Sequence, residues 1–150
     1  MKSETDLQHE LLSAWEDWLP TNWGRKLSNS FTSGIPDLML SGFGGPYIVE
    51  IKKISKLPVR ENTAVTFDHP LTALQNQTLI RLRRGGTYAG WWAIHRTFHE
   101  DGILVGHAQA DADIITMKGF IEKCMIRKRG QHWGEVFPTL LQGIRQGVHR

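Results

Sequence analysis

Residues 34–52, GIPDLMLSGFGGPYIVEIK, contain two short apolar runs separated by a connection rich in glycine. The first run, Ile35–Leu40, is entered through a proline, and the second is Tyr47–Lys52. Short apolar runs bounded by glycine and proline are typical of β-strands. Two strands joined by so short a turn, residues 41–46, pair as an antiparallel hairpin. This stretch therefore predicts a β-hairpin.

Polar residues interrupt the apolar pattern of the predicted hairpin. Side chains two apart on a strand point to the same face, so Glu50 and Lys52 emerge together and Ile51 points toward the core. Asp37 begins the partner strand, and strand pairing brings its carboxylate within a few ångströms of Glu50. Two carboxylates this close repel unless they share a proton or a cation. Because carboxylate oxygens suit Mg²⁺ or Mn²⁺, we expect a site for one of these ions here. The alternative is a turn aspartate and a surface ion pair.

Helical and extended patterns surround the hairpin. Ser3–Leu19 has apolar residues at helical spacing, with Ser3 and Asp6 in an approximate capping box. Residues 53–71 lack clear periodicity and predict a long loop, which is often functional. The other predicted elements are an extended segment within Arg25–Phe31, helices at Thr72–Arg84, Met117–Met125 and Phe137–Ile144, and strands at Tyr88–His95 and Ile103–Ala108.

Length and composition predict one globular domain, residues 1–150. Hydrophobic residues make up 40% of the 150 positions, which is enough for a core. No apolar run is long enough to span a membrane, and Met1–Glu10 is polar, unlike a secretory signal. The lone cysteine, Cys124, excludes an internal disulfide. We expect a cytoplasmic protein of a bacterial, archaeal or phage-infected host cell.

The charge is unevenly distributed along the chain. Residues 1–117 carry 11 Lys and Arg against 13 Asp and Glu, whereas residues 118–150 carry 7 against 2. Basic side chains also occur in groups, with aromatic residues interleaved. Such clusters favour a polyanionic partner such as nucleic acid, although a set of solvated faces would have the same composition. The sequence thus predicts a basic C-terminal segment at about 118–150.

The order of these motifs resembles the PD-(D/E)xK nuclease superfamily. Pro36-Asp37 precedes Glu50-x-Lys52, and Ser3-Glu4-x-x-Leu7-Gln8 resembles the opening helix of these enzymes. Leu74-Gln75, followed by Leu79, Leu82 and Gly85-Gly86, is similar to the next helix in VRR-NUC nucleases and in archaeal-type Holliday junction resolvases. The resemblance covers roughly residues 3–95. It implies an α/β fold of the restriction-endonuclease-like kind, a central mixed β-sheet flanked by helices.

The resemblance also implies a set of metal ligands. Asp37 and Glu50 would bind Mg²⁺, for which Mn²⁺ could substitute, with the backbone carbonyl of Ile51 as a further ligand. Glu4, on the opening helix, would bind the ion directly or through water. Glu4 falls within the apolar arc of that helix and Glu10 just outside it, so Glu4 is preferred and Glu10 is the alternative. Whether one or two ions act stays open.

The remaining implied roles concern the substrate. Lys52 would contact the attacking water or the scissile phosphate, acting as a cationic stabiliser because the ordinary pKa of lysine is about 10.4. Gln75 would orient a phosphate or a water. Residues predicted to bind DNA are Arg25, Lys26, Ser33, Lys53, Lys56 and Arg60.

Together these features predict a Mg²⁺-dependent, structure-selective endodeoxyribonuclease acting in DNA recombination or DNA repair, in a phage or a cell. The leading interpretation is a Holliday junction resolvase, which would act on a four-way junction as a homodimer with two symmetric active sites. The alternatives are a VRR-NUC type nickase or flap endonuclease, a non-catalytic DNA-binding module, and an RNA-directed enzyme.

The basic cluster Arg127–Arg129 yields a direct test of DNA binding. Replacing all three side chains by alanine should weaken binding and lower the slope of log affinity against log salt concentration, by up to about 0.9 per lost phosphate contact. Fluorescence anisotropy titrations at several salt concentrations would measure this slope. An unchanged slope would mean that the cluster is only solvated.

Overall fold

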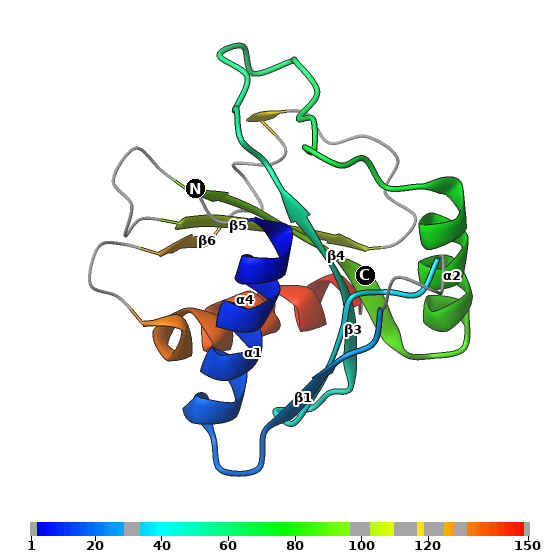
Figure 1. The fold of residues 1–150 in the computed structure, drawn as a ribbon, viewed down its shortest axis with the longest axis vertical. Helices are drawn as coiled ribbons and strands as arrows, with labels where there is room; N and C mark the ends of the chain where they lie inside the picture. Colours follow the sequence, from blue (N-terminus) through cyan, green and yellow to red (C-terminus); the bar gives the residue numbers. More distant parts are fainter. Residues whose placement is uncertain are drawn as a thin grey trace.

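The computed structural model of the chain describes residues 3–28, 34–96, 103–109, 117–118, 125–127 and 132–148. Within these ranges six strands form one sheet in the order β1-β2-β3-β4-β5-β6 (Figure 1). The strands are β1 (Trp23–Lys26), β2 (Leu38–Ser41), β3 (Tyr47–Lys53), β4 (Tyr88–Arg96), β5 (Ile103–Gln109) and β6 (Met125–Arg127). The helices are α1 (Glu4–Trp18), α2 (Ala73–Arg84) and α4 (Trp133–Val148).

The sheet is mixed. β3 and β4 run parallel, whereas the other neighbouring strands pair antiparallel. Parallel neighbours need a crossover connection, and here it contains residues 54–71 and α2. The predicted α/β class, with a central mixed sheet flanked by helices, is confirmed.

The predicted hairpin is β2–β3, paired in the register Leu38↔Val49. β2 begins at Leu38 rather than at Ile35. Pro36 has no backbone N–H to donate to a ladder, and at Asp37 the side chain, not the backbone, accepts the hydrogen bond from the Ile51 amide. Before Leu38 a side-chain contact therefore replaces the backbone pairing with β3.

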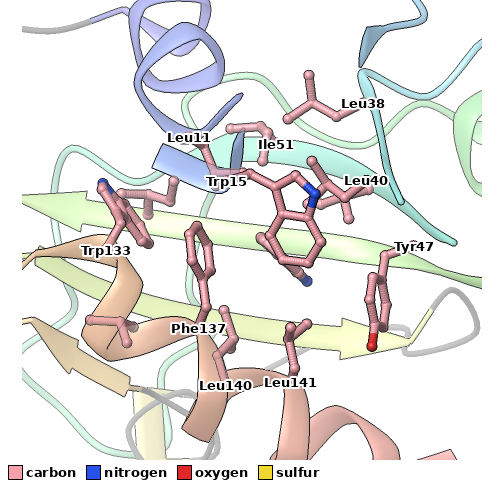
Figure 2. Close-up of a cluster of buried hydrophobic side chains, with 14 of the residues drawn as sticks. Leu11, Trp15, Leu38, Leu40, Tyr47, Ile51, Trp133, Phe137, Leu140 and Leu141 are labelled. Carbon is pink, nitrogen blue, oxygen red and sulfur yellow. The ribbon is translucent and has the colours of Figure 1, made fainter. Parts of the chain in front are cut away.

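The two faces of the sheet are covered differently. α1 and α4 pack on one face and enclose the larger core, whose centre is drawn in Figure 2. Phe137 of α4 lies with its ring centroid 5.3 Å from that of Trp15 and 5.6 Å from that of Trp133. The Trp15 indole also donates to the Ser41 carbonyl at 3.0 Å, which ties α1 to the end of β2. The opposite face is covered by α2, through Leu79, and by residues 54–71.

The starts predicted for α1 and α2 are confirmed by their caps, whereas the helix predicted at Phe137–Ile144 begins earlier, at Trp133, and extends to Val148. Ser3 Oγ accepts from the Asp6 amide at 3.2 Å, and the Asp6 carboxylate accepts from the Ser3 amide at 3.0 Å. Thr72 and Gln75 form the equivalent pair at α2. Such reciprocal capping satisfies backbone donors that a helix cannot pair internally. None of the helices in the described ranges is long and apolar enough to cross a membrane.

The predicted helix Met117–Met125 is wrong at its end. Residues 117–118 are helical, but Met125 lies in β6, where it pairs with Val105 of β5. At Met125 strand pairing with β5 overrides the helical spacing, and residues 119–124 lie outside the described ranges. The extended segment expected within Arg25–Phe31 is β1, which begins earlier, at Trp23, and ends at Lys26. Residues 29–31 lie outside the described ranges.

Phe137 offers a test of the packing of α4 on the sheet. Phe137→Ala should lower the free energy of unfolding by about 3–5 kcal/mol, because it leaves a cavity among three tryptophans. Thr139→Ala, at an exposed position of the same helix, should change it by no more than about 0.5 kcal/mol. Urea unfolding followed by tryptophan fluorescence would measure both. Equal midpoints for the two variants would contradict this packing.

Candidate active site

Three ionisable side chains are buried together beside the hairpin. Asp37, Glu50 and Lys52 are 8%, 2% and 3% exposed, respectively. Glu50 and Lys52 share the face of β3 that α2 covers, and Ile51 between them lies in the larger core on the other face. The alternation predicted for this strand is thus confirmed. Charged groups are rarely buried without paired partners, so their contacts decide what the cluster can do.

Asp37 is held by two donors, one on each carboxylate oxygen. Its Oδ2 accepts from the Ile51 amide at 2.8 Å, and its Oδ1 accepts from Ser28 Oγ at 3.1 Å. Ser28 is absent from the sequence-based prediction. It follows β1, where the Leu27 amide donates to the Asp37 carbonyl at 2.8 Å. The register between β1 and β2 was needed to find Ser28, and no local motif indicates it.

Gln75 links the cluster to α2. Its Nε2 donates to Glu50 Oε1 at 3.3 Å, and its Oε1 lies 3.5 Å from Lys52 Nζ. The same Oε1 accepts from the Thr72 amide at 3.0 Å, as part of the helix cap. Lys52 Nζ is 3.8 Å from Glu50 Oε1. The cap of α2 therefore fixes the amide between the two charged side chains.

Glu4 and Glu10, the two candidate glutamates of the opening helix, point in different directions. Glu4 Oε1 accepts from the Lys53 amide at 3.3 Å, directly after Lys52. Glu10 instead accepts from the Trp133 indole at 3.1 Å, toward α4. Figure 1 shows the N-terminal end of α1 beside β3. The structure thus places Glu4 at the rim of the cluster, as the helical arc predicted.

Residues 68 and 69 also reach this rim and were missed from the sequence. His69 Nδ1 lies 3.5 Å from Glu4 Oε1, and Asp68 accepts from the Ser55 amide at 2.8 Å. Although its partial burial opposes ionisation, the bonds from Ser55 hold the pKa of Asp68 below its ordinary value. Both residues lie in the stretch predicted only as a loop. Without a periodic pattern, the sequence does not indicate which of its side chains face the site.

The burial of Glu50 and the charges around it suit a bound cation. Burial, reinforced by the nearby Asp37 carboxylate, raises the pKa of Glu50 from 4.5 to about 8, and Lys52 opposes the rise. Glu50 Oε2 is buried without a hydrogen-bond partner. A buried oxygen of this kind usually has a partner, and a divalent cation between Asp37 and Glu50 would supply one. Within the described residues, no three His, Cys, Asp or Glu side chains form a ready-made metal group.

Most of the residues predicted to bind DNA lie outside the cluster. Arg25 pairs with Glu16 at 3.0 Å, and its guanidinium lies over the ring of Trp23 at 4.4 Å. Lys26, Lys56 and Arg60 are exposed, and Lys53 Nζ lies 3.8 Å from Asp68. Ser33, Lys128 and Arg129 fall outside the described residues.

Comparison with known proteins finds matching chains among solved structures. No protein-family model matches the chain, and no curated protein matches its sequence. The solved structure of Hjc, a Holliday junction resolvase from the archaeal hyperthermophile Archaeoglobus fulgidus, is similar with a TM-score of 0.46 and 15% sequence identity. The match covers 79% of this chain and 89% of that one.

The raised pKa of Glu50 predicts how the metal-free protein responds to pH. Between about pH 4.5 and 8 the folded state holds a proton on Glu50 that the unfolded state has lost. The contribution of Glu50 to the free energy of unfolding should therefore fall as pH rises through this range, by up to about 1.4 kcal/mol per pH unit. Glu50→Gln should remove that fall.

Urea unfolding in EDTA from pH 5 to pH 9 would measure this effect. Glu135→Gln, at an exposed position on α4, is the matched control and should keep the wild-type pH profile. Superimposable profiles for wild type and Glu50→Gln would show that Glu50 titrates normally in the folded protein.

Proposed function

We propose that this chain is a metal-dependent endonuclease that hydrolyses phosphodiester bonds in DNA. The observation that carries the proposal is the buried pair Asp37 and Glu50, with an unpartnered Glu50 oxygen and Lys52 on the same face. A binding module has no need to bury two carboxylates where they would face phosphate. The same pair is what a divalent cation requires.

The protein residues that would hold Mg²⁺ or Mn²⁺ are Asp37 and Glu50. The Ile51 carbonyl and Glu4, the latter directly or through water, would complete the set. When bound, such an ion lowers the pKa of its water and offsets negative charge on the phosphate. The two donors on Asp37 fix its carboxylate before the ion arrives, which reduces the reorganisation that binding requires.

Lys52 and Gln75 would act on the substrate. The Lys52 ammonium is held between Glu50 and Gln75, so its position is fixed in a site with little water. Preorganised positive charge of this kind stabilises the negative charge that develops on a phosphate during hydrolysis. Gln75, anchored through the cap of α2, would orient a phosphate oxygen or the attacking water.

For the DNA shape we propose a four-way junction, cut by a homodimer. The motif resemblance favours this substrate, and a two-fold symmetric dimer would present two active sites to opposing strands. A VRR-NUC type nickase or flap endonuclease is the second candidate, because the same motifs and the same chemistry serve it. The two candidates differ in substrate and not in site residues.

A panel of labelled DNA substrates tests the proposal. It contains a four-way junction, a flap, a nicked duplex, an intact duplex and a single strand, each with Mg²⁺ and with EDTA. Wild type should cut the junction in paired symmetric positions, and only with the metal. Glu50→Gln should lower the rate at least about 100-fold, since it removes a metal ligand, and should leave junction binding in Ca²⁺ intact.

The control for this experiment is again Glu135→Gln, which should retain wild-type cleavage. Faster cutting of flaps or nicks than of junctions would favour the second candidate and keep the site. Tight binding without cleavage in Mg²⁺ or Mn²⁺ would contradict the nuclease proposal and favour a DNA-binding module.

A further inference from the structure

Residues 54–71 form a packed projection from the sheet. Apolar side chains along the segment are turned inward, where Ile54 is buried against Trp91 and Ala93 and Phe67 packs on the Trp91 ring at 5.0 Å. The base is closed by a hydrogen bond from the Asp68 amide to the Lys53 carbonyl at 2.9 Å. In Figure 1 the segment extends beyond the end of β3.

Backbone contacts fix the outer part of this projection. The Thr63 amide donates to the Arg60 carbonyl at 3.2 Å, which forms a turn. The amides of Met117 and Lys118 donate to the carbonyls of Thr63 and Glu61 at 2.8 and 2.9 Å. The tip is thus tied to a second segment of the chain, so its side chains are presented on an ordered support.

One apolar side chain departs from this inward pattern. Val59 is 99% exposed and follows Pro58, which restricts the backbone there. The cationic side chains of Lys56 and Arg60 are exposed on either side of it, with Glu61 next in the chain. An apolar tip between two cations matches the chemistry of side chains that insert at DNA base steps while their neighbours contact phosphates.

The projection also begins at the candidate active site. Lys53, at its base, follows Lys52, and its amide donates to Glu4 at the rim. Val59 is the sixth residue after Lys53, so the tip reaches at most about 20 Å from that rim. At a rise of about 3.4 Å per base pair, this is about six base pairs of duplex.

We propose that Val59 is a specificity-determining residue that packs against an unstacked base pair where the DNA helix is interrupted, within about six base pairs of the cut. Lys56 and Arg60 contact the flanking phosphates. This inference rests on the proposed nuclease function and adds to it a way of selecting branched DNA. Insertion at a base step requires unstacking, and the step across a branch point is unstacked more easily than a step within a continuous duplex, so insertion costs less at the branch.

The experiment measures binding in Ca²⁺ to a four-way junction and to an intact duplex of the same sequence. The junction carries 2-aminopurine beside the branch, because the fluorescence of this base rises when it unstacks. Wild type should raise the fluorescence. Val59→Thr keeps the shape but makes the tip polar. It should abolish the rise and lower the ratio of junction affinity to duplex affinity at least about fivefold.

The matched control is Val59→Leu, which keeps an apolar tip and should behave like wild type. Since Val59 is fully exposed, neither variant should affect folding, and unfolding curves would verify this. If wild type cuts junctions but Val59→Thr keeps both the fluorescence rise and the affinity ratio, the inference is overturned and the nuclease proposal stands. If wild type neither binds nor cuts DNA, both fail.

Discussion

The hydrogen bond from the Ile51 amide to Asp37 joins the fold to the candidate site. It occupies a place where a strand ladder would otherwise supply a backbone acceptor, so the hairpin and the carboxylate position each other. Asp37 is thereby held beside Glu50, and the burial of that pair depends on β2 and β3 keeping one register. A slip of one residue would reverse which side chains of β3 face the core. Glu50 and Lys52 would then enter the larger core.

That register has support on both faces of the sheet. Ile51 and its alternate neighbours pack under α1 and α4, where Trp15 and Phe137 meet. On the other face Gln75 bonds to Glu50 from the cap of α2. Burying two carboxylates and a lysine costs desolvation free energy. The packing of the apolar core offsets this cost.

Local patterns in the sequence predicted the parts of this arrangement that depend on local rules. Strand alternation placed Glu50 and Lys52 on one face, capping residues placed the starts of α1 and α2, and the arc of the first helix favoured Glu4 over Glu10. Ser28 and His69 were missed because their contacts depend on strand pairing across β1 and on the path of residues 54–71. Neither has a periodic signal.

The error at Met125 has a related cause. The apolar spacing of residues 117–125 suits a helix, yet Met125 pairs with β5 in a strand of three residues. Edge strands so short carry little pattern of their own, and their conformation is decided by a partner that is distant in sequence. Helical periodicity was therefore a poor guide to where this segment ends.

Because the base of the projection is closed, its outer residues and the candidate site could vary independently of each other. Because Asp68 and Lys53 fasten the segment below its tip, the length and composition of the outer residues have little influence on the geometry of Asp37 and Glu50. Lengthening such a tethered loop costs only about 0.6 kcal/mol per doubling. The segment is thus a natural position for exchange, where the outer residues of one chain could be transplanted into another without rebuilding the candidate site.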